Sequence, residues 1–200
     1  DYLLKGYGMD QEKIMRVTRV VDVINKLDIY FDDTGTNTSL DIRAKARRLK
    51  AEIGGLDLVI IDYLQLMSSY KKNNENRQQE IAEISRSLKV LAKELSVPVI
   101  ALSQLNRTPA SRDDNKPRLS DLRESGAIEQ DADVVIFIYR KEVKDRGKDK
   151  VEANVNEVDD NKILVSIAKN RQGRTMDMEM NFYPKFTMFV DIETSDHGTQ

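Results

Sequence analysis

The stretch Leu58-Val59-Ile60-Ile61-Asp62 decides the fold class of this chain. An unbroken run of branched apolar residues that is too short for a globular helix is typical of a strand buried on both faces of a parallel sheet. A second run of this kind, residues 97–102, follows a helical pattern over residues 77–95. Strand, helix and strand in this order predict an α/β fold with parallel strands.

The same periodicities predict the other elements. Two more helices are expected, residues 10–27 and 39–53, the second capped by Thr38 or Ser39 and ended by Gly54-Gly55. Further strands are expected over residues 29–31, 134–139 and 163–168, and a hairpin over residues 178–182 and 186–190. Because no long helix separates the later strands, an antiparallel extension of the parallel sheet is expected. The loop 106–118 and the charged excursion 140–161 should lie on the surface.

Composition narrows the class of protein. The chain has 200 residues, of which 40% are hydrophobic, and these suffice for one substantial core. One domain over residues 1–193 with a polar tail, 194–200, is therefore expected. A net charge of -2 does not fit a polycation that coats nucleic acid, and the absence of cysteine excludes disulfides and thiolate metal sites. No run of 18 apolar residues and no signal-peptide pattern is present, so a cytoplasmic, soluble protein without membrane contact is expected.

Two strand ends carry polar residues suited to nucleotide chemistry. Ligands of parallel α/β sheets bind beyond the carboxyl ends of the strands. Asp62 stands at such an end, where an acid can hold Mg²⁺ through the water shell of the ion, although an Asp that caps the next turn is the plainer alternative. Gln104 ends the next strand and, if the two strands are adjacent, could reach a γ-phosphate or the attacking water; a solvated loop amide is the alternative.

A third strand end carries two cations. Lys169-Asn170-Arg171 follows the predicted strand 163–168 and offers Lys169 and Arg171 in alternating directions. Such cations could reach a phosphate on a neighbouring subunit, as an arginine finger does, where negative charge spreads in the transition state. A solvated basic turn is the competing interpretation.

Candidate nucleic-acid contacts lie in loops with a local positive excess, although a merely solvated loop is the more common explanation. These contacts are Lys71, Lys72 and Arg77 after the Asp62 strand, and Arg107, Arg112, Lys116 and Arg118 in the long loop. In the segment 121–133, Arg123, Ser125 and the amide of Gly126 suit one phosphate, with a short capped helix as the alternative. The basic helix 39–53 is interpreted as a solvated or subunit-contacting surface rather than a DNA face.

Seven ordered blocks carry a family resemblance. They cover residues 41–50, 59–66, 75–80, 83–89, 97–105, 123–133 and 168–171, and the clearest read VIIDYLQL at 59–66, VPVIALSQL at 97–105 and RESGAIEQDAD at 123–133. Together they resemble the C-terminal domain of the bacterial and phage replicative helicases, the DnaB family. An ordered set of blocks is far more specific than any single motif.

This resemblance implies a RecA-like P-loop NTPase core with a mainly parallel sheet, flanking helices and an antiparallel C-terminal extension. It implies an ATP-dependent DNA helicase that forms a homohexameric ring, hydrolyses ATP with Mg²⁺ between subunits, and moves 5′ to 3′ on single-stranded DNA to unwind the duplex. Asp62 then resembles the Walker B acid and Gln104 the phosphate sensor. Primase, a helicase loader and other copies of the chain are the implied partners.

The resemblance also assigns the remaining polar residues. Lys169 and Arg171 correspond to the cations offered to the ATP of the neighbouring subunit. Arg123, Glu124 and Gly126 match the loop of the family that binds DNA phosphates.

Two departures from the family pattern are visible. The phosphate loop Gly-x-x-x-x-Gly-Lys-Ser/Thr is absent, because the pair Gly147-Lys148 is followed by Asp149 and has Glu142 in place of the first glycine. The catalytic glutamate of the family is expected upstream of Asp1. The sequence is therefore expected to be N-terminally incomplete and inactive without its upstream part. A recombinase-type ATPase and a non-catalytic ring or loader-binding module stay open as alternatives, the first disfavoured by the Arg-Glu-Ser-Gly and Lys-Asn-Arg blocks.

Overall fold

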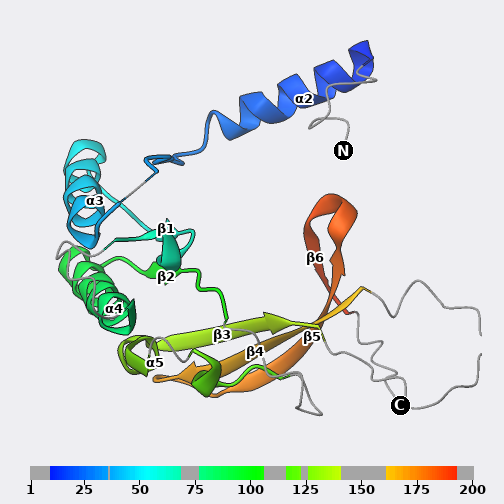
Figure 1. Cartoon of the computed structure of the whole chain (residues 1–200). Helices are drawn as coiled ribbons and strands as arrows, with labels where there is room; N and C mark the ends of the chain where they lie inside the picture. The colour runs from blue at the N-terminus through cyan, green and yellow to red at the C-terminus, as the bar shows by residue number, and fades with distance from the viewer. Residues whose placement is uncertain are drawn as a thin grey trace, which may run out of the picture. The chain divides into compact units, whose positions relative to one another are not determined.

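The structure is a computed structural model of the whole chain, and it describes residues 10–35, 37–68, 77–105, 116–122, 126–140 and 161–192. The described residues up to Gly35 form one unit and those from Asn37 onward form a second (Figure 1). In these described ranges no helix combines the length and the apolar character needed to cross a membrane. The predicted excursion lies almost wholly outside the described residues.

The first unit contains one helix, α2 (Gln11–Ile24). Asp10 caps it by accepting a hydrogen bond of 2.8 Å from the amide of Lys13. The predicted helix is confirmed, although it ends at residue 24 rather than 27. The predicted strand over residues 29–31 is wrong for this structure: the segment forms no strand, and Phe31 is 87% exposed. A strand requires a hydrogen-bonded neighbour, and none pairs with this segment among the described residues.

In the second unit, α3 (Ser39–Ile53) and α4 (Arg77–Leu95) have the bounds that the sequence predicts. The Thr38 hydroxyl accepts a hydrogen bond of 3.2 Å from the amide of Asp41, and the Asp41 carboxylate accepts one of 2.9 Å from the amide of Thr38. This capping box satisfies donors that the first turn of a helix leaves without partners. At the other end, Gly54 adopts a φ of 78°, a left-handed conformation that ends the helix at little cost only for glycine.

A parallel pair of strands packs against these helices. Strands β1 (Val59–Ile61) and β2 (Val99–Ala101) pair in parallel, with Ile61 opposite Ala101, as predicted. The main hydrophobic cluster joins one side of this pair to α3 and α4, and contains Ala46, Ile61, Leu64, Met67, Ile84, Leu88, Leu91, Leu95 and Val97. The prediction that these strands are buried on both faces of the sheet is wrong. Ile60 is 61% and Ile100 48% exposed, because the helices cover only one face of the pair within the described residues.

The last four strands form an antiparallel sheet in chain order (Figure 1). They are β3 (Val134–Tyr139), β4 (Lys162–Asn170), β5 (Met176–Tyr183) and β6 (Met188–Asp191), with the short helix η4 (Pro184–Phe186) between the last two. The predicted antiparallel C-terminal strands and their closing hairpin are confirmed, but among the described residues they form a sheet of their own, with no strand paired to β1 or β2. Strand β4 runs to Asn170, so Lys169 lies within the strand rather than beyond it.

A short helix, α5 (Gly126–Asp131), connects the helical part of this unit to the antiparallel sheet. Its residue Ile128 packs against the main cluster and also against a second cluster formed by Leu122, Val135 and Phe137. Helix α5 therefore contacts α4 on one side and the sheet on the other. The short helices η1 (Leu64–Leu66) and η2 (Leu119–Asp121) complete the described elements.

Candidate functional site

The ends of β1 and β2 bring two predicted residues to one edge. The amide of Leu102 donates to the carbonyl of Ile61 and the amide of Leu64 donates to the carbonyl of Leu102, both at 2.9 Å, so the two chains stay paired as they leave the strands. Asp62 follows β1 directly and is exposed. Among the described residues its carboxylate has no hydrogen-bond or ion-pair partner, which argues against the plainer alternative that it caps the next turn.

Gln65, which no strand-end signal in the sequence singled out, fixes the main chain at Gln104. The Gln65 side-chain amide donates to the carbonyl of Gln104 at 3.2 Å, and its oxygen accepts from the amide of Gln104 at 3.3 Å. It also donates to the Ser103 hydroxyl at 3.0 Å. The carbonyl of Gln65 itself accepts a hydrogen bond of 2.6 Å from Arg77. Gln104 therefore sits on a constrained backbone while its own side chain is exposed.

The surroundings of this edge suit a hydrated metal ion. An open hollow of about 340 Å³ is lined by Tyr63, Leu102, Ser103 and Gln104. In the part of the chain that the structure describes, no group of three or more His, Cys, Asp or Glu side chains could enclose a metal. A single accessible carboxylate beside open space fits Mg²⁺, which keeps several waters and binds through one or two carboxylates and substrate phosphates. Asp62 is the residue that would hold it.

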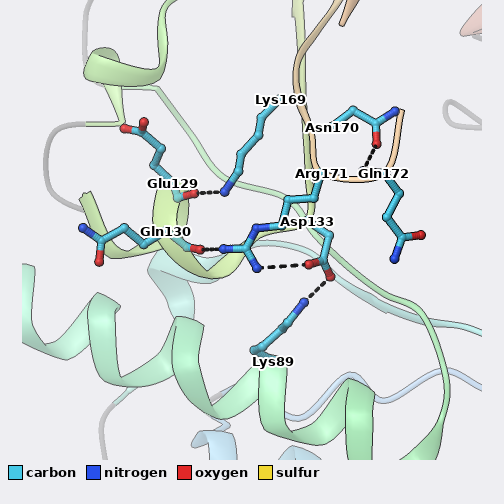
Figure 2. A network of polar contacts seen from close by, with 8 residues as sticks. All are labelled: Lys89, Glu129, Gln130, Asp133, Lys169, Asn170, Arg171 and Gln172. Carbon is cyan, nitrogen blue, oxygen red and sulfur yellow. Dashed lines mark hydrogen bonds and ion pairs between the residues drawn. The ribbon is translucent and has the colours of Figure 1, made fainter. Parts of the chain in front are cut away.

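Lys169 and Arg171 both contact the last turn of α5 (Figure 2). The Lys169 ammonium donates to the carbonyl of Glu129, and the Arg171 guanidinium donates to the carbonyl of Gln130. The last carbonyls of a helix lack partners within the helix, which explains why cations bind there. The predicted alternating directions are wrong, because residues two apart in an extended chain point to the same side. The alternative of a merely solvated basic turn is also wrong.

Asp133 links Arg171 to helix α4. One carboxylate oxygen of Asp133 lies 3.4 Å from Nη1 of Arg171, and the other pairs with the ammonium of Lys89 (Figure 2). The amide of Arg171 also donates to the carbonyl of Asp133 at 2.9 Å. The hydrogen bond from Lys89, together with the charges of Lys89, Arg171 and Lys169, lowers the pKa of Asp133, although burial acts in the opposite direction. The carboxylate is therefore ionised at neutral pH.

No local sequence signal pointed to Lys89 or Asp133 as parts of this cluster. Both residues stand in blocks that carry the family resemblance, at 83–89 and 123–133. Only the packing of α4, α5 and β4 brings them together.

Few of the predicted DNA contacts lie in the described residues. Gly126 is the exposed first residue of α5, and a Cβ atom there would meet nothing within 4 Å, so packing within the chain does not require a glycine. Lys116 pairs with Asp177 of β5, which offsets part of its charge locally. Arg77 pairs with Glu80 and donates to the carbonyl of Gln65, and the amide of Arg118 donates to the Asp121 carboxylate at 2.8 Å. The remaining predicted contacts lie outside the described residues: Lys71, Lys72, Arg107, Arg112, Arg123, Glu124 and Ser125. Their roles stay predictions.

The basic helix α3 uses its cations within the chain. Arg43 and Arg47 both pair with Glu94 of α4, and Lys50 donates to the carbonyl of Leu95. Lys45 donates to the side chain of Asn37 at 2.8 Å. Arg47 remains 52% exposed and Arg48 is also exposed, so the cations of α3 lie at the surface as expected, and their contact with another subunit stays a prediction.

Comparison with protein families gives one match over nearly the whole chain. The family described as DnaB-like helicase C terminal domain matches residues 2–191. The replicative DNA helicase DnaB of Geobacillus stearothermophilus is 47% identical over 178 residues, which are 89% of this chain and 37% of that protein. The replicative DNA helicase DnaC of Bacillus subtilis (strain 168) is 42% identical over 190 residues, 95% of this chain and 40% of that protein. The chain thus spans less than half of these relatives.

Solved structures give the same result. A DnaB-like replicative helicase, described together with its interactions with primase, matches with a TM-score of 0.77 and 37% identity over 94% of this chain and 42% of that one. A second structure, described as an ATPase domain, matches with a TM-score of 0.78 and 37% identity over 93% of this chain and 62% of that one. Both matches agree with the predicted RecA-like α/β fold, and the first favours the helicase interpretation over the recombinase interpretation.

Proposed function

Since this chain belongs to the DnaB-like helicase C-terminal domain family, we propose that it is the motor part of a replicative DNA helicase. Six identical subunits would form a ring that couples ATP hydrolysis to 5′ to 3′ movement on single-stranded DNA and to unwinding of the duplex. One observation carries this proposal. The parallel strands β1 and β2 deliver Asp62 and Gln104 to the same edge, where the Asp62 carboxylate has no partner among the described residues.

The residues of this edge would have separate tasks. Asp62 would hold Mg²⁺, which neutralises charge on the β- and γ-phosphates of ATP when bound. Gln104 would contact the γ-phosphate or orient the attacking water. Lys169 and Arg171 would act on the ATP of the neighbouring subunit, where added positive charge stabilises the transition state. Hydrolysis would then depend on two adjacent subunits.

DNA and protein partners follow from the same proposal. Arg123, Glu124 and Gly126 would contact DNA phosphates, assisted by Lys71, Lys72, Arg107, Arg112 and Lys116. Residues 1–193 would act as one motor domain, followed by the polar tail 194–200. A primase and a helicase loader are the proposed protein partners, and the first is supported by the similar helicase structure described with primase interactions.

ATP hydrolysis by the intact gene product tests this function. We expect single-stranded DNA to stimulate hydrolysis and Arg171→Ala to abolish it, because loss of an arginine finger lowers the rate by about 10³-fold or more. Mixing Arg171→Ala with Asp62→Asn chains should restore part of the activity, since some interfaces then combine an intact Asp62 with an intact Arg171. Arg48→Ala, which removes an exposed cation of α3, should behave like the parent protein.

Two outcomes would contradict the proposal. Hydrolysis that does not respond to DNA would remove the motor function. An intact product that binds a fluorescent nucleotide without hydrolysing it would instead favour the non-catalytic ring or loader-binding module.

A further inference from the structure

We propose that Asp133 is a positioning residue for Arg171 and that Lys89 holds Asp133 in place for this task. The inference rests on the proposed function, in which Arg171 acts on a phosphate of the neighbouring subunit. Asp133 and Lys89 would orient the Arg171 guanidinium before the phosphate of the neighbouring subunit binds.

Arg171 is held by three contacts within its own chain. Its main-chain amide donates to the carbonyl of Asp133 at 2.9 Å, its Nη1 faces the Asp133 carboxylate at 3.4 Å, and its Nη2 donates to the carbonyl of Gln130. A guanidinium has five N–H donors in a planar fork. Each terminal nitrogen therefore retains a second N–H that can bind a phosphate oxygen while the contacts to Asp133 and Gln130 persist.

Lys89 on α4 supports the Asp133 carboxylate. The Asp133 side chain is 54% exposed, so burial alone does not fix its rotamer. Lys89, only 24% exposed, extends from α4 and pairs with the carboxylate oxygen that Arg171 does not contact. The neighbouring residue Leu88 is buried in the main cluster, which anchors this part of α4. Asp133 thus bridges Lys89, which is fixed on α4, and Arg171, which is proposed to contact the phosphate of the neighbouring subunit.

Helix α5 links both cations to the hydrophobic clusters of the unit. Its last-turn carbonyls bind Lys169 and Arg171, while Ile128 packs against both hydrophobic clusters of the unit. Hydrophobic packing and hydrogen bonds to Lys169 and Arg171 therefore fix the position of α5. A well-supported guanidinium loses less freedom when it binds a phosphate, and small displacements of a catalytic group are costly.

Steady-state hydrolysis by the intact, DNA-stimulated protein tests the inference. We expect Asp133→Asn to lower kcat by about 10- to 100-fold, the loss that misplacement of a catalytic group produces. KM for ATP should stay within about twofold, because the residue acts in the transition state and not in nucleotide binding. Asp131→Asn is the matched control, since this nearby carboxylate contacts neither Lys89 nor Arg171 in the described residues, and it should keep the parent rate.

Subunit mixing separates positioning from a structural role. If Asp133 acts through Arg171, an Asp133→Asn chain should regain activity when mixed with Asp62→Asn chains, as Arg171→Ala does, because the neighbour then supplies an intact Asp133 and Arg171. A folding defect confined to its own chain would not be rescued in this way. Lys89→Met should reproduce the lower kcat in a milder form, and Lys89→Arg, which keeps the charge, should restore most of it.

The outcomes distinguish this inference from the proposed function. If Arg171→Ala is rescued by mixing but Asp133→Asn has the parent kcat, the positioning role is overturned and the helicase function stands. A low kcat for Asp133→Asn without rescue, or with a lower melting temperature and a raised KM, would show a structural role only. If Arg171→Ala is not rescued, both fail together.

Discussion

The end of β1 and the end of β4 hold their charges in opposite ways. Asp62, after β1, is exposed and has no partner among the described residues. Lys169 and Arg171, at the end of β4, are bound by carbonyls of α5, and Arg171 also by Asp133. A carboxylate that must exchange water and phosphate ligands on its ion benefits from the first arrangement. The second arrangement fixes the direction of a cation, which suits the proposed contact of Arg171 with a phosphate on another subunit.

Stability alone does not explain the cluster at β4. Ion pairs in contact with solvent contribute about 0–1 kcal/mol each, because water screens them and long side chains lose freedom. The Lys89–Asp133 and Arg171–Asp133 pairs are partly exposed and belong to this class. Substitutions at either strand end are therefore expected to lower the hydrolysis rate more than they lower the stability of the fold.

Among these further variants, the largest effect is expected for Asp62→Asn. Hydrolysis should fall by about 100-fold or more, because the neutral amide cannot hold Mg²⁺ at developing phosphate charge. The melting temperature should not fall, since the carboxylate has no partner to lose among the described residues. Both quantities can be measured on the intact protein, with Asp57→Asn, another exposed aspartate near β1, as the control. A marked loss of stability would break the contrast between the two strand ends.

Gln65→Ala tests whether the edge of β1 and β2 also contains a fixed part. The Gln65 amide binds the main chain of Gln104 through two hydrogen bonds and should keep the sensor in place. We expect the DNA-stimulated rate to fall by about tenfold, a smaller loss than for Asp62→Asn because Gln104 itself is retained. Gln79→Ala, on the exposed side of α4, is the control. An unchanged rate would show that Gln104 does not need this support.

Gly126→Ala tests the first residue of α5, at the opposite end of the helix from the carbonyls that bind Lys169 and Arg171. A Cβ atom there has space within the chain, so the fold should keep its stability. If a DNA phosphate approaches the backbone closely, the methyl group should weaken DNA binding by about three- to tenfold without changing its salt dependence, because no charge is lost. Fluorescence anisotropy with labelled single-stranded DNA measures this, with Gly55→Ala as the control. Unchanged affinity would exclude a close approach at this position.

Local signals in the sequence predicted some elements to the residue. The bounds of α3 and α4 follow from Thr38, Gly54 and a regular apolar period, all of which act within a few residues. The segment 29–31 has strand-like residues but forms no strand, because pairing depends on a distant neighbour. Elements set by local chemistry were thus predictable, and an element set by pairing was not.

The candidate site shows the same division. The position of Asp62 and Gln104 at one edge was predictable, because Asp62 directly follows one apolar run and Gln104 follows another after Ser103. The cluster of Lys89, Asp133 and Arg171 was not, since its members come from α4, from the residues after α5 and from the end of β4. These residues lie far apart in the sequence, so no motif spacing predicts that they form one cluster.

Glu94→Gln is expected to give the smallest effect. It measures how much an ion-paired carboxylate without a proposed role in catalysis contributes to the melting temperature. The hydrogen bond from Arg47, with that from Arg43, lowers the pKa of Glu94 from its ordinary value of 4.5. A carboxylate whose pKa is lower in the folded state stabilises the fold above the unfolded value, and this stabilisation is lost as the pH falls through the lowered value. At pH 7 we expect the variant to melt about 2 °C below the parent and to keep its hydrolysis rate.

The pH dependence of this difference decides its cause. Below pH 4.5 the parent carboxylate becomes protonated as the pH approaches its lowered pKa, so the two melting temperatures should converge. Thermal melts over this range measure the convergence, with Glu52→Gln, an exposed residue of α3, as the control. A difference that persists in acid would come from altered packing rather than from charge. If Glu94→Gln instead slowed hydrolysis as much as Asp133→Asn, loss of any ion pair in the unit would lower the rate. The effect of Asp133→Asn would then give no support for a specific role beside Arg171.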